Sequence, residues 1–341
     1  MEEHPAPLLV DEAQYAPNLF SYIKMKVDRS DENGMYWLTG SQQFHLMKNV
    51  SESLAGRVGI VNLNSFMYSE IKRNTSKVLF DPLNLKKAEK IDVNELYELI
   101  YKGGMPALYK DSNIDSNIYF QGYLDTYISR DVRELTEVGN VDSFKKFIVS
   151  VASRTGEQLN YSALANDAGI SVPTAKSWLS ILTSSGLVYL LEPYMSSELK
   201  RITHIPKIIF MDTGLACFLA GWDSPRELQL SSSSGHYLET YVVSEIIKSY
   251  NARGIRPNLS YYRDKDKNEI DLIFYKNNTL YPFEIKKTAS PNKSMIKNFD
   301  LLSKVNKKVG TGGIICLYDD LMHLDEKNFI IPISSVINGK D

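Results

Sequence analysis

The fold of the last third of the chain is decided by the stretch Glu269-Ile270-Asp271-Leu272-Ile273-Phe274-Tyr275-Lys276-Asn277-Asn278-Thr279-Leu280-Tyr281-Pro282-Phe283-Glu284-Ile285-Lys286. Two apolar runs flank Asn277-Asn278, a pair that tolerates the positive φ angles of a two-residue hairpin turn. Counting back from this turn places Asp271 opposite Glu284 and Glu269 opposite Lys286. Because side chains alternate between the faces of a strand, all four charged residues share one face. The sequence therefore predicts a hairpin that pairs two carboxylates.

Two carboxylates that face each other on a sheet repel, and a divalent cation between them removes this repulsion. Asp271 and Glu284 are therefore the candidate ligands of Mg²⁺, which would polarise a phosphoryl oxygen. Lys286, on the same face, is the candidate for orienting or activating a water for attack on a phosphodiester. Glu239, on the helix predicted for residues 237–250, is a further candidate catalytic carboxylate. The alternative is a solvated hairpin face on which Lys286 and Lys287 neutralise the acids.

The apolar composition of the other face favours the cation site. This face carries Leu272, Phe274, Phe283 and Ile285, so we expect it to be buried. From residue 248 to residue 308 there are fourteen Lys and Arg against six Asp and Glu, whereas the whole chain has a net charge of −2. This local excess of positive charge suits a polyanion, and nucleic acid is the predicted partner.

Composition excludes several other classes of protein. The 341 residues are 43% apolar and 23% charged, which is typical of a globular protein of two to three domains. The two cysteines exclude a disulfide scaffold and a Cys-based zinc site. Apolar runs are too short for a membrane span, and the acidic N-terminus is unlike a signal peptide. We expect a cytoplasmic protein with no membrane association.

A helix-turn-helix pattern precedes the last segment. Gly169 is placed to end one helix and Ser171 to cap the next, and an apolar strand follows from Leu187 to Leu191. A helix, a glycine turn, a capped helix and a strand are typical of a winged helix. Its capped helix offers a single cation to DNA, Lys176, so DNA binding and pure scaffolding both stay open.

The first segment has the pattern of an open α/β sheet. Apolar runs at residues 8–10 and 35–38 predict buried strands, residues 18–27 predict a helix, and a third apolar stretch covers residues 58–63. Polar residues follow the strands, where ligands of such sheets bind. Residues 92–140 are predicted to be helical. Residues 196–235 are predicted to be a connector that ends in a flexible run of serines, Ser231 to Gly235.

Two resemblances join these patterns. Glu239, Asp271 and Glu284-Ile285-Lys286 resemble the E…D…ExK signature of the PD-(D/E)xK nuclease superfamily, whose core is α-β-β-β-α-β. The whole chain resembles the predicted bacterial and archaeal AAA-superfamily ATPases whose C-terminal half is a domain of unknown function. The motifs that carry this second resemblance are Leu8 to Gln14 (Walker B), Trp37 to Gln42 (sensor), Ser53 to Arg57, Gly103 to Pro106, Tyr127 to Asp131, Pro206-Lys207 and Asp212 to Ala216.

The ATPase resemblance implies an ATP and Mg²⁺ site. It implies that Asp11 is a Mg²⁺ ligand, that Glu12 is the water-activating base and that Arg57 contacts the γ-phosphate; Ser41 lies in the sensor stretch and is a further nucleotide-binding candidate. The chain departs from the family in one respect, because the motif G-x-x-x-x-G-K-[ST] occurs nowhere in it. We therefore expect a truncated or mis-started gene that does not hydrolyse ATP alone, and an incomplete sheet through which chains self-associate.

Together these observations predict an α/β multidomain protein with three alternative functions. It would be the C-terminal portion of a nucleic-acid-associated AAA-type ATPase with a Mg²⁺-dependent nuclease-like domain, a non-enzymatic DNA- or protein-binding module, or an ATPase completed by the phosphate loop of another chain. The predicted segments are a remnant of an AAA-type P-loop ATPase domain (1–75), a helical linker (76–140), a winged-helix-like domain (141–195), a connector (196–235) and a restriction-endonuclease-like α/β domain (236–341).

Overall fold

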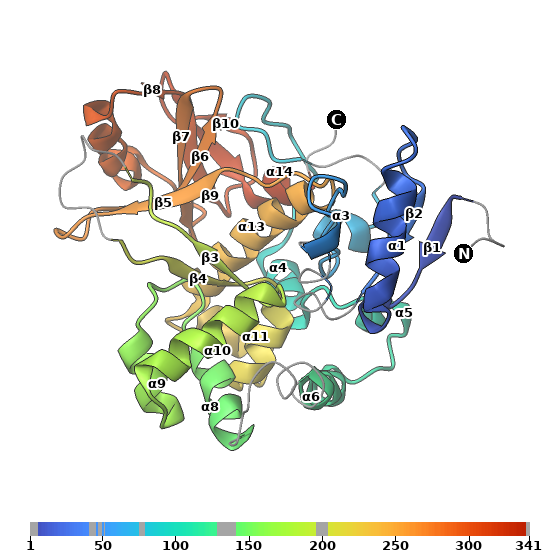
Figure 1. The fold of residues 1–341 in the computed structure, drawn as a ribbon. Coiled ribbons are helices and arrows are strands. Elements are labelled where there is room, and N and C mark those ends of the chain that lie inside the picture. Colours follow the sequence, from blue (N-terminus) through green and yellow to red (C-terminus); the bar gives the residue numbers. More distant parts are fainter. Residues whose placement is uncertain are drawn as a thin grey trace.

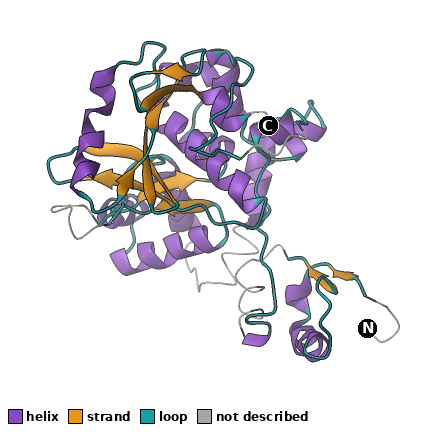
Figure 2. Cartoon of the chain, turned by 90° about the horizontal axis from the view of Figure 1, so that it is seen from above, coloured by secondary structure: helices purple, strands orange, loops and turns teal. Residues whose placement is uncertain are grey.

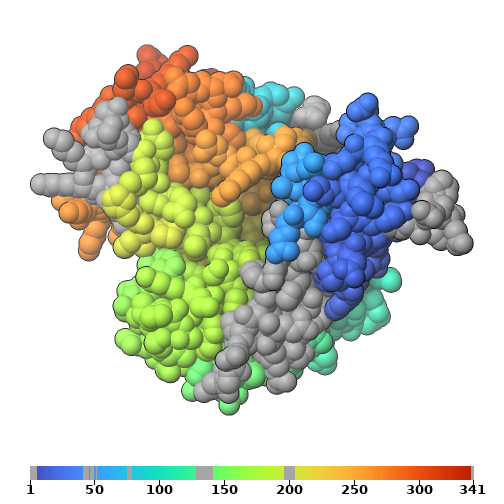
Figure 3. All heavy atoms as spheres, in the orientation of Figure 1, coloured from blue at the N-terminus to red at the C-terminus, as the bar shows by residue number. Residues whose placement is uncertain are grey.

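The computed structural model describes residues 6–40, 46, 50, 52–74, 79–127, 141–195 and 204–338. It is an α/β protein, with a seven-stranded sheet and two two-stranded sheets among the described residues (Figure 1). In Figure 3 the N-terminal residues (blue) lie at one side of the molecule, and the residues of the middle segment (green) lie below those of the last third of the chain (orange and red).

The N-terminal segment forms a small unit. Its strands β1 (Leu8–Val10) and β2 (Tyr36–Leu38) are parallel, and the helices η1 (Ala13–Tyr15) and α1 (Pro17–Val27) lie between them in the sequence. Phe20 and Ile23 of α1 are buried in a separate apolar cluster. Figure 2 shows this unit projecting from the rest of the chain. The first two predicted strands and the helix are thus confirmed.

The third apolar stretch, at residues 58–63, forms no strand. Gly59 and Asn62 interrupt its apolar run, and the segment has no regular secondary structure and no strand partner among the described residues. Its apolar side chains are largely exposed, and Leu63 is 93% exposed. The segment leads to Phe66, whose amide donates to the carbonyl of Gly104.

Helices follow from residue 68 to residue 127. They are α3 (Tyr68–Ile71), α4 (Val93–Lys102), α5 (Ala107–Lys110) and α6 (Ser116–Tyr127). The Asp92 side chain accepts a hydrogen bond from the Asn94 amide and begins α4, and Gly103 ends it with a φ of 70°. The helical prediction is confirmed for this part, and residues 128–140 lie outside the described residues.

The middle segment contains α8 (Val141–Ala152), α9 (Tyr161–Ala168) and α10 (Val172–Ser184), then the antiparallel strands β3 (Val188–Leu191) and β4 (Lys207–Phe210). Gly169 ends α9 in the left-handed conformation, and the Ser171 hydroxyl accepts from the Thr174 amide, as expected. Phe144 and Phe147 pack edge-on against Trp178 and join α8 to α10.

Residues 204–235 of the segment predicted to be a connector are folded, and residues 196–203 lie outside the described residues. After β4 come α11 (Thr213–Ala220) and α12 (Pro225–Leu230), and the serine run leads directly into α13 (Ser234–Asn251). The Ser234 carbonyl accepts from the Tyr97 hydroxyl, and its own hydroxyl accepts from Lys287 Nζ. The prediction of a flexible joint is wrong because these tertiary contacts hold the serines.

The large sheet has the order β10-β11-β9-β7-β6-β5, and β8 also pairs with β7. Strands β5, β6 and β7 form an antiparallel meander, and β7, β9 and β11 are parallel neighbours. The helix α13 contacts β7, β4 and α14 and is buried along most of its length. The bounds are β5 (Leu259–Arg263), β6 (Glu269–Lys276), β7 (Thr279–Lys286), η3 (Lys293–Lys304), β8 (Lys308–Val309), β9 (Gly312–Cys316), β10 (Met322–His323), β11 (Asn328–Pro332) and α14 (Ile333–Ile337).

The predicted hairpin register is confirmed. Lys276 pairs with Thr279, and the pairing continues to Leu272 and Phe283. Asn277 and Asn278 have φ angles of 50° and 57°, as a two-residue primed turn requires. The next residues back along the two strands are Asp271 and Glu284.

Candidate metal centre

The two carboxylates of the hairpin are buried. Asp271 is 5% exposed and Glu284 is 3% exposed. The Ile285 amide donates to Asp271 Oδ2 at 2.8 Å, so the Asp271 side chain reaches across to the backbone of β7. The alternative of a solvated hairpin face is therefore wrong for these acids.

Lys286 joins the two carboxylates. Its Nζ lies 2.7 Å from Asp271 Oδ2 and 2.7 Å from Glu284 Oε2. Its side chain is 38% exposed, so this end of the cluster reaches solvent. The second oxygen, Glu284 Oε1, is buried and has no hydrogen-bond partner within the part of the chain that the structure describes. A buried polar atom without a partner is rare and points to a missing ligand or proton.

A second lysine completes the cluster. Lys207, the first residue of β4, lies 2.6 Å from Glu239 Oε1 on α13 and 2.6 Å from Glu269 Oε1 on β6. Glu269 Oε2 also lies 2.5 Å from Arg263 Nη1. Glu269 is thus ion-paired with both Lys207 and Arg263. Glu239 has Lys207 as its ion-pair partner, which the sequence analysis did not predict.

Burial and charge shift the pKa values of the two strand acids in opposite directions. Burial, reinforced by the neighbouring Asp271 carboxylate, raises the pKa of Glu284 to about 9. Burial also opposes the ionisation of Asp271, but the charges of Lys207 and Lys286 and the Ile285 amide outweigh it and lower the pKa of Asp271. In the fold, Asp271 is thus the ionised acid and Glu284 the protonated one at neutral pH.

The other members of the cluster respond to the same two causes. Burial raises the pKa of Glu239 to about 7 despite the ion pair with Lys207. Burial disfavours the charge of both lysines, but the surrounding carboxylates outweigh it and raise the pKa of Lys207 and of Lys286. Both ammonium groups therefore stay charged at neutral pH.

The donor set fits a Mg²⁺ ion that keeps most of its waters. Among the described residues no three His, Cys, Asp or Glu side chains converge on one point. Mg²⁺ is commonly held by one or two carboxylates together with waters and substrate phosphates. Asp271 and Glu284, with the unpartnered Oε1, supply such a pair, so these two residues would hold the cation.

The predicted nucleotide-binding residues do not converge. Asp11 follows β1 and accepts a hydrogen bond from the Thr39 hydroxyl, which follows β2. Glu12 accepts from Gln14 Nε2 at 2.5 Å. Arg57 is ion-paired with Asp28. Asp28 follows the C-terminal end of α1, whereas Asp11 precedes the N-terminal end of this helix. Ser41 lies outside the described residues. This arrangement does not form a triphosphate site by itself.

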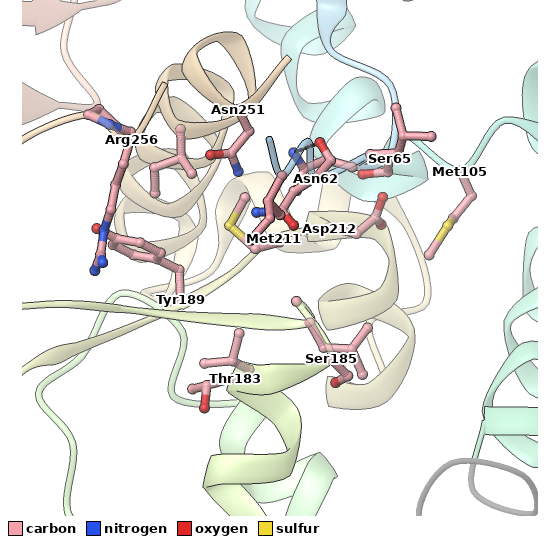
Figure 4. Close-up of a pocket in the computed structure, with 18 of the residues that line it drawn as sticks. Asn62, Ser65, Met105, Thr183, Ser185, Tyr189, Met211, Asp212, Asn251 and Arg256 are labelled. Carbon is pink, nitrogen blue, oxygen red and sulfur yellow. Dashed lines mark hydrogen bonds between the residues drawn. The ribbon is translucent and has the colours of Figure 1, made fainter. Parts of the chain in front are cut away.

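A separate cavity of about 710 Å³ lies between the 60–65 segment, the C-terminal end of α13 and β3 (Figure 4). Its polar lining includes Asn62, Asn251 and Arg256, and Asp212 borders it. Asp212 is already engaged, because it accepts from the amides of Gly104 and Leu215. None of the predicted site residues lines this cavity.

Comparison with known families divides the chain into three matched regions. Residues 1–72 match an AAA domain. Residues 93–226 match one domain of unknown function (DUF8612), and residues 234–336 match another (DUF4143). The chain is thus similar to an AAA-type ATPase that carries domains of unknown function. The cluster of charged side chains draws Lys207 from the second region and its other members from the third.

Two curated relatives are similar in sequence to most of this chain. The uncharacterized proteins Mb2031c of Mycobacterium bovis and Rv2008c of Mycobacterium tuberculosis are each 28% identical over 287 residues, which is 84% of this chain. The chain spans 59% of the length of each of them.

In the described part of the structure no helix has the length and apolar character that a bilayer crossing demands.

Proposed function

We propose that the chain is the nucleic-acid-directed C-terminal portion of an AAA-type ATPase, with a Mg²⁺-dependent phosphodiester-hydrolysing centre at Asp271, Glu284 and Lys286. The observation that carries this proposal is the buried pair of carboxylates on adjacent strands, bridged by Lys286, with Glu284 Oε1 unpartnered among the described atoms. Glu239 supports the pair from α13 through Lys207.

The order of elements around these residues supports the proposal. After α13 come the three antiparallel strands β5, β6 and β7, then η3, and then the two-residue strand β8 and the longer β9, both of which are parallel to β7. This is the α-β-β-β-α-β order of the PD-(D/E)xK superfamily, with a 3-10 helix in the fifth place. The acids lie on the second and third strands, where the signature of that superfamily places them.

Each residue has a definite part in such a reaction. A bound Mg²⁺ polarises a phosphoryl oxygen and lowers the pKa of a coordinated water. Asp271 and Glu284 hold the cation, and the fixed Asp271 carboxylate is oriented by the Ile285 amide. Lys286 is the partly exposed cation of the cluster, so its ammonium can orient a water or neutralise charge on a phosphodiester.

Exposed lysines support a nucleic-acid contact at the large sheet as part of this proposal. Lys265 and Lys267 lie in the turn between β5 and β6, directly between Arg263 and Glu269, and Lys293 and Lys297 lie on η3. The Asn298 side chain of η3 donates to the Glu269 carbonyl, which brings this helix to the same edge. The winged-helix-like segment contributes less, because Lys176, the one cation of α10, lies over the Tyr161 ring.

A non-enzymatic binding module is the second candidate function. The observation that favours it is that Lys286 is already ion-paired with both strand acids without a metal. In this alternative the cluster only stabilises the fold, and the lysine edge binds nucleic acid or a protein.

Self-association is a further part of the proposal. Leu9 and Trp37 pair across β1 and β2, and both are more than 60% exposed. A short two-stranded sheet with an exposed apolar face invites association with another copy. In the alternative of an ATPase completed by another chain, the phosphate loop of that chain would enter at this place.

Titration calorimetry with Mn²⁺ tests the metal centre. Wild type should bind Mn²⁺ with measurable heat, and Asp271→Ala should lose this binding. Asp125→Asn is the matched control, because Asp125 is an exposed acid that is also ion-paired to a lysine, Lys145. Equal heats in wild type and Asp271→Ala, or none in either, would leave the binding module as the better account.

A further inference from the structure

The charges of the cluster divide into two halves. Glu239 and Glu269 are ion-paired with Lys207 and Arg263, so two negative charges meet two positive charges. Asp271 and Glu284 share Lys286, the one cation that ion-pairs with them among the described residues. With both acids ionised, as a metal requires, this second half carries one uncompensated negative charge, and it also contains the unpartnered oxygen.

We propose that Lys207 is a positioning residue whose ammonium takes the place of a second cation, so that the centre holds one divalent ion between Asp271 and Glu284. This inference rests on the proposed function and specifies its metal stoichiometry. Glu239 and Glu269 lie on either side of Lys207 as Asp271 and Glu284 lie on either side of Lys286, so without the Lys207 ammonium this first pair of carboxylates would offer ligands to a second cation.

The geometry around Lys207 supports this role. Its Nζ lies between two carboxylate oxygens at 2.6 Å each, and the Tyr261 ring lies 5.1 Å away on another side. Lys207 is 2% exposed, so the ammonium cannot leave the cluster for solvent without moving β4. β4 is fixed by its pairing with β3 and by a bridge to Gln158. The charge is therefore held in place as a bound cation would be.

The proposal also explains why Glu239 would not be a metal ligand. Glu239 Oε1 accepts a hydrogen bond from Lys207, whereas the Asp271–Glu284 pair is bonded to the other lysine, Lys286. Lys207 belongs to the 93–226 region, whereas the four acids belong to the 234–336 region. In this proposal the number of metal ions in the 234–336 region is thus set by a residue from the 93–226 region.

The stoichiometry of Mn²⁺ binding tests the proposal. Calorimetry and the paramagnetic resonance signal of Mn²⁺ should give one ion per wild-type chain. In Lys207→Met, which keeps the length but removes the charge, a second ion should bind between Glu239 and Glu269. Without metal this variant should melt at a lower temperature than wild type, and Mn²⁺ should raise its melting temperature more than that of wild type.

The double variant Lys207→Met/Glu239→Gln is the control. It removes one ligand of the second ion and one uncompensated charge, so it should fold without metal and bind one Mn²⁺ again. Two ions in wild type, a single ion in Lys207→Met, or a Lys207→Met chain that stays unfolded in Mn²⁺ would overturn the proposal. No binding in wild type would instead contradict the proposed function itself.

Discussion

Replacing Glu284 with Gln should stabilise the metal-free protein at neutral pH. Gln has nearly the shape of a protonated glutamate and carries no charge. Glu284 is 3% exposed, lies beside Asp271 and has a pKa raised to about 9 by burial and by that neighbour. The unfolded chain ionises this group near pH 4.5, whereas the folded chain keeps it protonated until about pH 9.

The size of the effect follows from proton linkage. Below pH 4.5 the raised pKa brings no penalty, and the stability is then lost as the pH rises toward 9. Each pH unit in this window removes about 1.4 kcal/mol. At pH 7 the free energy of unfolding of Glu284→Gln should therefore exceed that of wild type by about 3 kcal/mol. The difference should disappear near pH 4.5, because both states of wild type then hold the proton.

Urea unfolding at pH 5, 6 and 7 in EDTA measures this difference. Asp271→Asn is the matched control with the opposite sign, because Asp271 has a lowered pKa and accepts from the Ile285 amide and Lys286. It should lose about 1–3 kcal/mol at pH 7. A Glu284→Gln chain that is less stable than wild type at pH 7, or a difference independent of pH, would refute the reasoning.

Three further outcomes are expected. Trp37→Ser should shift sedimentation toward the monomer, because it removes the exposed apolar face of β2; an unchanged distribution would mean that chains associate elsewhere, if at all. Gly103→Ala should lower the free energy of unfolding by about 2 kcal/mol or more, measured in urea, because φ is +70° and a Cβ would collide with the carboxylate that caps α11. Replacing Lys293 and Lys297 with Ala should reduce the salt dependence of DNA binding by about one contact each, whereas Lys176→Ala should leave it unchanged.

Local patterns were enough to predict the hairpin of the candidate site. The turn residues Asn277-Asn278 and the alternation of side chains fix the register, and both are properties of adjacent residues. The helix caps at Asp92 and Ser171 were predictable for the same reason. Each of these features depends on a few neighbouring residues, so no knowledge of tertiary contacts is needed.

Features that depend on distant partners were not predictable. Lys207 lies 32 residues before Glu239, and a lysine at the start of an apolar strand was the only local signal of its role. The run of serines at the start of α13 has a composition typical of flexible linkers, but Tyr97 and Lys287 both donate hydrogen bonds to Ser234. The apolar run at residues 58–63 has strand-like composition, yet no described strand pairs with it.

Cleavage of single- and double-stranded DNA in Mg²⁺ by wild type and Lys286→Ala tests the central claim most directly. Lys286 bridges the two strand acids but is not a metal ligand, so its removal should abolish cleavage while Mn²⁺ still binds. We predict Mg²⁺-dependent cleavage by wild type that EDTA stops and that Lys286→Ala lacks. No cleavage of either substrate by wild type, or equal cleavage by Lys286→Ala, would contradict the account.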